Sequence, residues 1–203
     1  IDVFGRDSEA VLRLAWLNSH HQTGLKNLLD LAVLAHGEGH DWPQRWAKVD
    51  EIPFDFQRRR MSVVVQSLDD HGQPLLICKG AVEEVLAQCT RVRGGSADAG
   101  TDDAEVPLTP EHLARLQGLA GALNDDGLRV LAVAVRRFDG PRPAFHAADE
   151  NELTLAGFVA FLDPPKETTA PALQALARHG VAVKVLTGDN ERVTLKICRE
   201  VGL

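Results

Sequence analysis

Apolar residues recur three and four positions apart in the first part of the chain, which is the spacing of an amphipathic helix. The pattern occurs in "SEAVLRLAWLNSH" (8–20) and in "GLKNLLDLAVLAH" (24–36), and Gly37 and Gly39 then interrupt it. We therefore expect two helices before residue 37. The next segment, "DWPQRWAKVDEIP" (41–53), combines Trp, Pro and charged residues and is predicted to be a loop.

Two short runs between residues 61 and 79 are rich in β-branched and apolar residues. They are "MSVVVQSL" (61–68) and "PLLICK" (74–79), and "DDHGQ" between them has the composition of a hairpin turn. They predict a strand, a turn and a second strand. "GAVEEVLAQCT" (80–90) predicts a helix that follows the second strand directly at Gly80.

Irregular and periodic segments alternate in the middle of the chain. "RVRGGSADAGTDDAEVP" (91–107) contains small and acidic residues without periodicity, which predicts a mobile loop. Thr109, Pro110 and Glu111 are typical of a helix start, with Pro at the first helical position. "LRVLAVAVRRF" (128–138) then predicts another strand.

Continuous apolar strands alternate with helices in the last part of the chain. "LTLAGFVAFLDPP" and "VAVKVLTGDN" are apolar strands, and "ETTAPALQALARHG" and "ERVTLKICREVGL" have helical spacing. This order is typical of a βαβ unit in a parallel sheet that is buried on both faces. We therefore place a domain boundary near residue 156, between residues 1–156 and 157–203. The second part is shorter than a domain of roughly 100 residues, so we expect it to be incomplete.

The composition is that of an ordinary globular protein with an excess of acid. The 203 residues are enough for one domain, or for one domain and part of another. The formal net charge of -7 argues against a general binder of nucleic acid or anionic membranes, because such proteins carry a broad positive surface. An anionic ligand must therefore be held by a local group of cations.

The three cysteines, Cys78, Cys89 and Cys198, have no C-x-x-C spacing, and any disulfide scheme leaves one of them unpaired. This favours a reducing compartment, the cytoplasm. No apolar segment reaches the roughly 20 residues of a membrane-spanning helix, and the first residues lack the layout of a signal peptide. They also lack an initiator Met, so the chain could be a piece of a longer protein.

"FDFQRRRMSVVV" (54–65) places two aromatic residues and three arginines directly before a strand. The aromatic residues (Phe54 and Phe56) and the arginines (Arg58, Arg59 and Arg60) then share a small surface that suits a nucleotide, because a ring stacks on a base and guanidinium groups bind phosphate oxygens. The alternative is structural. In that interpretation the two aromatic rings belong to the core or anchor a loop, and the solvated arginines protect the edge of a sheet from aggregation.

"CKGA" (78–81) adds a second cation at the end of a strand. Lys79 is followed by Gly80, which would let a ligand approach the backbone closely, and a helix N-terminus that begins there offers N–H groups to an anion. The alternative is a solvated lysine and a turn glycine. Arg129, at the start of another strand, gives a weaker signal, because a single arginine at a strand end is usually on the surface.

Thr187, Gly188 and Asp189 in "VKVLTGDN" follow an apolar strand and precede a helix. They would therefore lie at the carboxyl end of a parallel strand, where open α/β sheets bind ligands. A hydroxyl, a flexible backbone and a carboxylate there could position a phosphate and Mg²⁺. The alternative is a loop with a helix cap at Asp189 or Asn190.

Other motifs are absent or unconvincing. "HGEGH" (36–40) spaces two histidines four residues apart, but the intervening glycines disfavour a helical zinc motif, and we assign no metal site. The chain contains neither G-x-x-x-x-G-K-[ST] nor G-x-G-x-x-G. The sequence therefore does not support P-loop or Rossmann dinucleotide chemistry.

Five segments together resemble the cytoplasmic nucleotide-binding region of P-type ATPases. In chain order they are "FDFQRRRMSVVV", "CKGAVEEVL", "GLRVLAVA", "LDPPKETTAPAL" and "LTGDN". With "QTGLKNLLDLAVL" they are most similar to the bacterial magnesium-transporting subgroup. The resemblance implies an α/β fold class: an antiparallel sheet with flanking helices in a nucleotide-binding domain, followed by a partial Rossmann-like βαβ unit of the phosphorylation domain.

The resemblance also implies roles for individual residues in binding ATP. Phe54 would stack on the adenine, and Lys79 and Gly80 would line the base pocket. Arg59, in place of a lysine, and Arg129 would contact the phosphates. Asp30 would bond the adenine amino group.

Members of the family phosphorylate an aspartate in D-K-T-G-T and hold Mg²⁺ with a later G-D-G-x-N-D, and neither motif occurs in this sequence. Thr187, Gly188 and Asp189 would help to place the phosphoryl group in the intact pump, whereas this chain alone would bind ATP without hydrolysing it. By resemblance, the parent is an inner-membrane ATPase that imports Mg²⁺. Its partners would be ATP and the remaining phosphorylation, actuator and transmembrane domains of the same chain, with no nucleic acid.

Two other functions remain open at this point. A non-catalytic sensor of adenine nucleotides would need the same binding residues and no catalytic motif. A separate phosphatase with a related core would need an aspartate nucleophile at a strand end, and the sequence has no D-x-D or D-K-T-G that would supply it.

Overall fold

The computed structural model describes residues 1–24, 26–69, 72–94, 104–162, 165–187 and 191–203. It contains two compact units. The first comprises Ile1–Gln117 and Leu131–Val159, and the second comprises Gly118–Val130 and Ala160–Leu203. The expected boundary near residue 156, and the assignment of the two parts to nucleotide-binding and phosphorylation domains, stay predictions.

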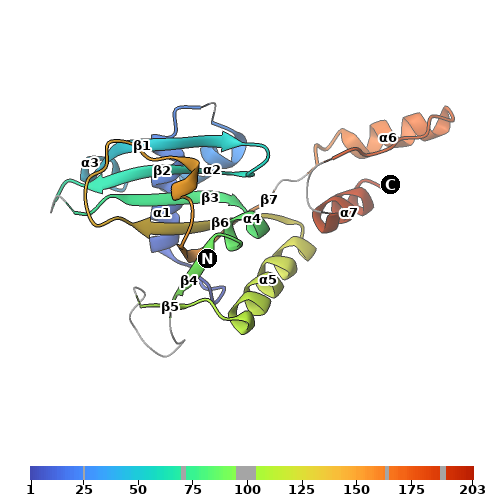
Figure 1. The fold of residues 1–203 in the computed structure, drawn as a ribbon. Coiled ribbons are helices and arrows are strands. Elements are labelled where there is room, and N and C mark those ends of the chain that lie inside the picture. Colours follow the sequence, from blue (N-terminus) through green and yellow to red (C-terminus); the bar gives the residue numbers. More distant parts are fainter. Residues whose placement is uncertain (25, 70–71, 95–103, 163–164, 188–190) are drawn as a thin grey trace. The chain divides into compact units, whose positions relative to one another are not determined.

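A seven-stranded sheet in the order β1-β2-β3-β6-β7-β4-β5 is the main element of the fold (Figure 1). Its strands are β1 (Trp46–Asp55), β2 (Arg60–Ser67), β3 (Leu75–Ala81), β4 (Cys89–Arg93), β5 (Glu105–Pro107), β6 (Leu128–Arg137) and β7 (Leu153–Leu162). The β1–β2, β2–β3, β3–β6 and β4–β5 pairs are antiparallel, and β4 runs parallel to β7. The predicted class, an α/β fold with an antiparallel sheet and flanking helices, is confirmed.

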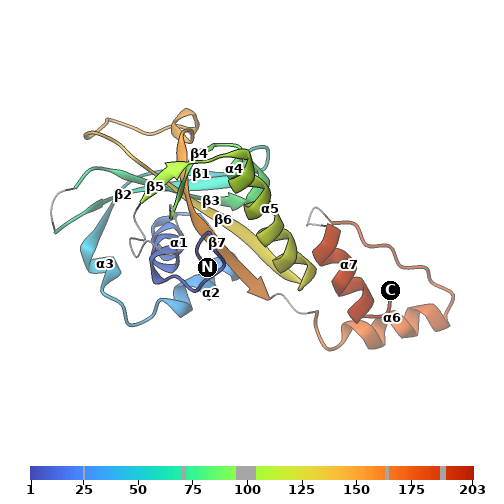
Figure 2. The ribbon, with the colours of Figure 1, turned by 90° about the horizontal axis from the view of Figure 1, so that it is seen from below.

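The helices are α1 (Glu9–His21), α2 (Leu28–His36), α3 (Trp42–Arg45), α4 (Val82–Leu86), α5 (Pro110–Asp125), α6 (Thr169–Arg178) and α7 (Glu191–Glu200), with a 3-10 turn at Ala147–Asp149. Helix α1 packs on strands β1 to β3 (Figures 1 and 2), and the Asn18 amide donates a 2.9 Å hydrogen bond to the Ile77 carbonyl on β3. The predictions of α1, α2 and α5 from apolar spacing are confirmed. Among the described residues, none of these helices has both the length and the apolar character needed to cross a bilayer.

Strands β1, β4 and β5 were not predicted from the sequence. β1 occupies the segment expected to be a loop, and only Ile52 of its ten residues is buried, because the strand lies at one edge of the sheet. β4 and β5 form at the two ends of the segment expected to be mobile. Residues 95–103 of that segment lie outside the described residues.

The expected βαβ unit is not formed as predicted. Its first strand is β7, which joins the seven-stranded sheet beside β4, and α6 follows. Residues 181–187, expected to be the second strand, have no strand conformation. Parallel strands depend on partners at their sides, and the described part of the second unit contains no neighbouring strand for this segment.

The second unit leaves much of its apolar surface exposed. Leu186 is 94% exposed, and Val185 and Leu195 are nearly half exposed. A hollow of about 280 Å³ is lined by α6, by residues 181–183 and by the last residues of the chain. Exposed apolar side chains that gather in this way are normally covered by other protein surface.

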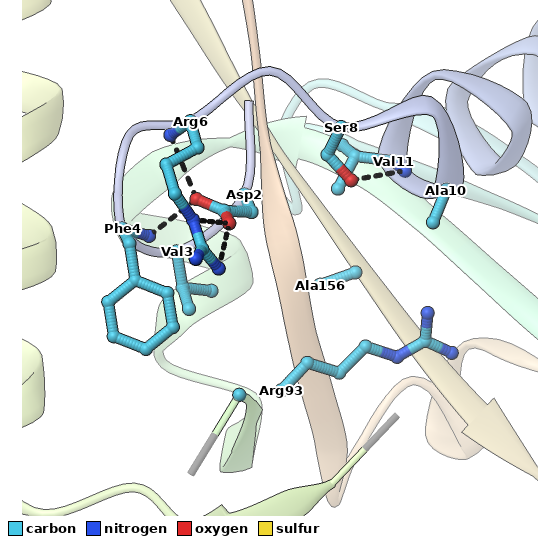
Figure 3. Close-up of a pocket in the computed structure, with 10 residues that line it drawn as sticks. Asp2, Val3, Phe4, Arg6, Ser8, Ala10, Val11, Arg93 and Ala156 are labelled. Atoms are coloured by element: carbon cyan, nitrogen blue, oxygen red, sulfur yellow. Dashed lines mark hydrogen bonds and ion pairs between the residues drawn. The ribbon is translucent and has the colours of Figure 1, made fainter. Parts of the chain in front are cut away.

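The N-terminal segment forms a small hollow against β4 and β7 (Figure 3). The Asp2 carboxylate accepts hydrogen bonds from the Phe4 and Arg6 backbone N–H groups and from the Arg6 side chain, and Ser8 caps α1 by accepting from Val11. The cavity volume is about 20 Å³, which is enough for about one water molecule. It is therefore too small for a nucleotide base.

His21, at the end of α1, gives the fold a specific sensitivity to acid. Burial, followed by the nearby His20 and two lysines, lowers the pKa of His21 from 6.5 to about 4. Between about pH 6.5 and about pH 4 the His21 ring is therefore protonated in the unfolded chain but neutral in the folded chain. The free energy of unfolding should fall as the pH decreases through this range.

We expect His21→Gln to flatten that part of the stability curve. One proton corresponds to about 1.4 kcal/mol per pH unit, and the half-buried ring should show only part of that slope. Urea unfolding at intervals of pH measures it, with His36→Gln at an exposed histidine as the control. An unchanged slope in His21→Gln would contradict the assignment.

Candidate functional site

Phe54 is the next-to-last residue of β1, and Arg59 is the last residue of the tight turn that joins β1 to β2. The Asp55 side chain accepts hydrogen bonds of 2.8 Å from the backbone N–H groups of Gln57 and Arg58, and the Arg59 N–H donates to the Asp55 carbonyl at 2.7 Å. Arg59 adopts a φ of 47°, a left-handed conformation that is uncommon for a residue other than Gly. Several hydrogen bonds therefore hold the turn in a strained conformation, as often occurs at functional sites.

Two phenyl rings project from this turn into solvent. Phe54 is 51% exposed and Phe56 is 89% exposed, and their rings meet edge to face with centroids 5.3 Å apart. Their exposure excludes the interpretation in which these aromatic residues belong to the core. A large exposed apolar side chain on a rigid turn is a candidate contact for a planar ligand.

The three consecutive arginines have different partners. Arg58 and Arg60 both bond the Glu150 carboxylate, at 2.5 Å and 2.9 Å. Arg59 instead bonds Glu84 on α4 at 2.9 Å, and its side chain is 49% exposed. Arg58 and Arg60 are thus structural cations, and Arg59 is the one of the three that a ligand at the turn can reach.

Glu150 is the centre of a buried polar cluster on one face of the sheet. Its side chain has no exposed area and also accepts a 2.7 Å hydrogen bond from the Ser62 hydroxyl. Ser62 pairs with Cys78 on β3, where burial, followed by the charge of Glu150, raises the thiol pKa to about 12. Cys78 therefore stays a protonated, structural thiol.

Lys79 and Asp30 form a buried ion pair on the opposite face, since neighbouring residues of a strand point to opposite sides. The Lys79 ammonium donates to Asp30 Oδ1 at 2.7 Å and to the Ser19 hydroxyl at 2.6 Å. The Ser19 hydroxyl also donates to Oδ1, at 2.9 Å, and Oδ2 accepts from the Asn27 N–H in the cap of α2. The two oxygens of Asp30 are thus already engaged with groups of the protein.

Charge and burial compete in this pair. Burial alone would raise the pKa of Asp30, but the adjacent Lys79, together with hydrogen bonds from Gln22 and Ser19, outweighs burial and lowers that pKa below its usual value. Burial lowers the pKa of Lys79, and the attraction of Asp30 opposes this only in part. Lys79 and Asp30 are 6% and 3% exposed, so neither is a surface contact in this conformation.

Gly80 is required by the neighbouring strand. It pairs with Arg60, and a Cβ atom at Gly80 would lie 2.4 Å from the Arg60 Cβ and 2.6 Å from the Arg59 carbonyl oxygen. Space on that side of Gly80 is therefore occupied by β2. The glycine allows the Arg59 turn to approach β3, where the Arg59 carbonyl accepts a 3.0 Å hydrogen bond from the Ala81 N–H.

The register places most of the expected site residues at one end of three adjacent strands. Asp55, next to Phe54, pairs with Arg60, and Arg60 pairs with Gly80, next to Lys79. Arg129 is half-buried and belongs to the second unit, so the structure does not assign it to this group. Thr187, also in the second unit, is exposed, and Gly188 and Asp189 lie outside the described residues.

Three residues that contact the site were not identified from the sequence. Ser19 lies within the apolar pattern of α1, and Glu84 and Glu150 are acids in segments with several others. Each meets its partner across 25 or more residues of sequence. Spacing along the chain gives no signal for such contacts.

The fold and site define a class of protein: a mixed α/β domain with an exposed aromatic ring and a cation beside a fixed turn. Residues 5–168 match the family described as P-type ATPase, cytoplasmic domain N. The chain belongs to this family.

Individual relatives show which members of the family this chain is similar to. The whole chain is 51% identical to the Magnesium-transporting ATPase, P-type 1 of Escherichia coli K12, and 52% identical to the protein of that name from Salmonella typhimurium 14028s. A Calcium-transporting ATPase 3, endoplasmic reticulum-type, of Arabidopsis thaliana is 33% identical over 87% of the chain. The chain spans 22% of the length of the two bacterial relatives.

Proposed function

We propose that the turn at residues 54–60 binds ATP, with the Phe54 ring stacked on the adenine and the Arg59 guanidinium bonded to phosphate oxygens. The observation that supports this most is the pairing of a half-exposed ring with a half-exposed cation on a backbone held by its own hydrogen bonds. Such preorganisation lowers the entropic cost of binding.

Lys79, Asp30 and Gly80 support the site from within in this proposal. Lys79 provides positive charge behind the turn, and Asp30 and Ser19 hold its ammonium group in place. Asp30 thus acts through Lys79, because its oxygens already accept protein hydrogen bonds. Gly80 keeps β2 and β3 close enough for the Arg59 turn to form. Arg129 would reach the phosphates when the parent protein is assembled.

We further propose that the parent chain is a bacterial inner-membrane ATPase that imports Mg²⁺, with this part in the cytoplasm. The relatives with 51% and 52% identity are named for magnesium transport, whereas the calcium-transporting relative shares 33%. The exposed apolar surface of the second unit suits cover by the remaining phosphorylation domain, and the actuator and transmembrane domains would complete the pump.

The described residues do not fit a resident Mg²⁺ site. They bring together no group of three or more His, Cys, Asp or Glu side chains that could ligate a metal. Thr187, with Gly188 and Asp189, would position the phosphoryl group only when the rest of the active site is present. This chain alone should bind ATP with a dissociation constant on the order of 0.1–1 mM. It should release no phosphate, because its sequence has no D-K-T-G aspartate to accept the phosphoryl group.

We expect Phe54→Ala to weaken ATP binding by about 1–3 kcal/mol, the range of base–aromatic stacking. NMR titration with ATP measures the change, and thermal unfolding should be nearly unaffected because the ring is half exposed. Phe56→Ala is the matched control, since this ring is more exposed and meets the Phe54 ring edge to face. Equal losses in the two variants, or unchanged affinity in Phe54→Ala, would reject the proposed stack.

A further inference from the structure

Arg59, the candidate phosphate partner, is already bound to an acid. Its Nη1 donates to Glu84 Oε1 at 2.9 Å, and the Glu84 side chain is 26% exposed. Arg58 and Arg60 cannot substitute for it, because both are bonded to the buried Glu150. A phosphate at this turn therefore meets a cation that has an anionic partner in the free protein.

The backbones on both sides of this ion pair are fixed. The Arg59 N–H and carbonyl are bonded to Asp55 and Ala81, and the Glu84 carbonyl lies 3.5 Å from the Arg60 guanidinium as an acceptor. Helix α4 is anchored by buried Val82, Val85 and Leu86. An exchange of partners at Arg59 thus requires only side-chain rotation.

The Glu84 carboxylate depends on Arg59 for its hydrogen bond and its counter-charge. Its Oε1 accepts from Arg59, whereas its Oε2 is buried and has no hydrogen-bond partner among the described residues. A phosphate that binds Arg59 must either displace Oε1, which leaves a partly buried carboxylate without its cation, or share the guanidinium with a like charge. Both outcomes oppose binding of the anion.

We infer that Glu84 competes with the nucleotide phosphates for Arg59 and so sets an upper limit on ATP affinity. This inference rests on the proposed ATP site. The opposition should increase with the negative charge of the ligand and vanish for adenosine, which carries no phosphate. Glu84 thus weakens the binding of both ATP and ADP, that of ATP more strongly, and favours the release of both, while the stack on Phe54 is unaffected.

The test uses Glu84→Gln, which keeps the size of the side chain and removes its charge. We expect ATP to bind roughly two- to tenfold more tightly by calorimetry, the range for a partly exposed ion pair and its repulsion of phosphate. Adenosine affinity should not change. Glu83→Gln, at the exposed neighbouring acid of α4, is the control and should leave ATP affinity within about twofold.

A double variant, in which Glu84→Gln is combined with Arg59→Ala, separates this inference from the proposed function. In Arg59→Ala, which should bind ATP more weakly than the unchanged chain, Glu84→Gln should have no further effect. Weaker ATP binding in the Glu84→Gln single variant would show that Glu84 positions Arg59 and would overturn the inference. Unchanged binding would also overturn it. If Arg59→Ala itself leaves ATP affinity unchanged, the proposed phosphate contact fails and the competition fails with it.

Discussion

Glu150→Gln is expected to destabilise the fold by about 3–5 kcal/mol, the usual cost of removing one partner from a buried ion pair. The Glu150 carboxylate has no exposed area and balances the charges of Arg58 and Arg60. Gln is neutral, and its NH₂ group would face guanidinium donors. The two arginines would then remain partly buried without a counter-charge, and the free energy needed to bury these unpaired charges opposes folding.

Urea unfolding followed by circular dichroism measures this loss. Glu152→Gln is the matched control, because Glu152 lies two residues away and pairs with Arg136 while 69% exposed. We expect it to cost at most about 1 kcal/mol. A loss of similar size in both variants would mean that burial of the Glu150 cluster contributes little to stability.

The Glu150 cluster also connects stability to the candidate site. Arg58 donates to Glu150 and to the Pro53 carbonyl, so it holds the segment that carries Phe54. We therefore expect folded Glu150→Gln to lose ATP affinity through a looser turn. This loss should affect adenosine and ATP equally, in contrast to the effect at Arg59.

Local pattern was enough to predict much of the fold. Helices α1, α2 and α5 have clear apolar spacing, and β2, β3 and β6 are apolar runs at the centre of the sheet. β1 was missed because an edge strand with one buried residue has no apolar alternation to detect. The strand expected at residues 181–187 has the apolar sequence of a buried strand but no partner among the described residues of its unit.

The candidate site was predictable as a set of residues but not as a set of contacts. Residue type and position indicated the aromatic and arginine residues of 54–60, and the family resemblance singled out Phe54 and Arg59, which are both half exposed. The pattern could not show that Arg58 and Arg60 are bonded to an acid about ninety residues away. Nor could it show that Lys79, expected at a strand end, is buried against Asp30. Such pairings arise from tertiary packing.

The second large effect on stability is expected at the Lys79–Asp30 ion pair. Lys79→Met leaves Asp30 buried with only neutral donors, and Asp30→Asn leaves the ammonium of Lys79 buried without a counter-charge. Each change should cost about 3–5 kcal/mol. The double variant should cost clearly less than the sum, because neither charge is then left alone in the interior.

A double-mutant cycle by urea unfolding measures that coupling, and Arg45→Met in the exposed Arg45–Asp69 pair is the control, with an expected cost of at most about 1 kcal/mol. The double variant also tests function. It removes the lysine without leaving Asp30 as an unpaired anion, so any remaining loss of ATP affinity in the folded double variant reports what the charge of Lys79 contributes to binding. If ATP affinity in that variant equals that of the unchanged chain, Lys79 has a structural role alone, and the base site consists of the Phe54 turn without support from β3.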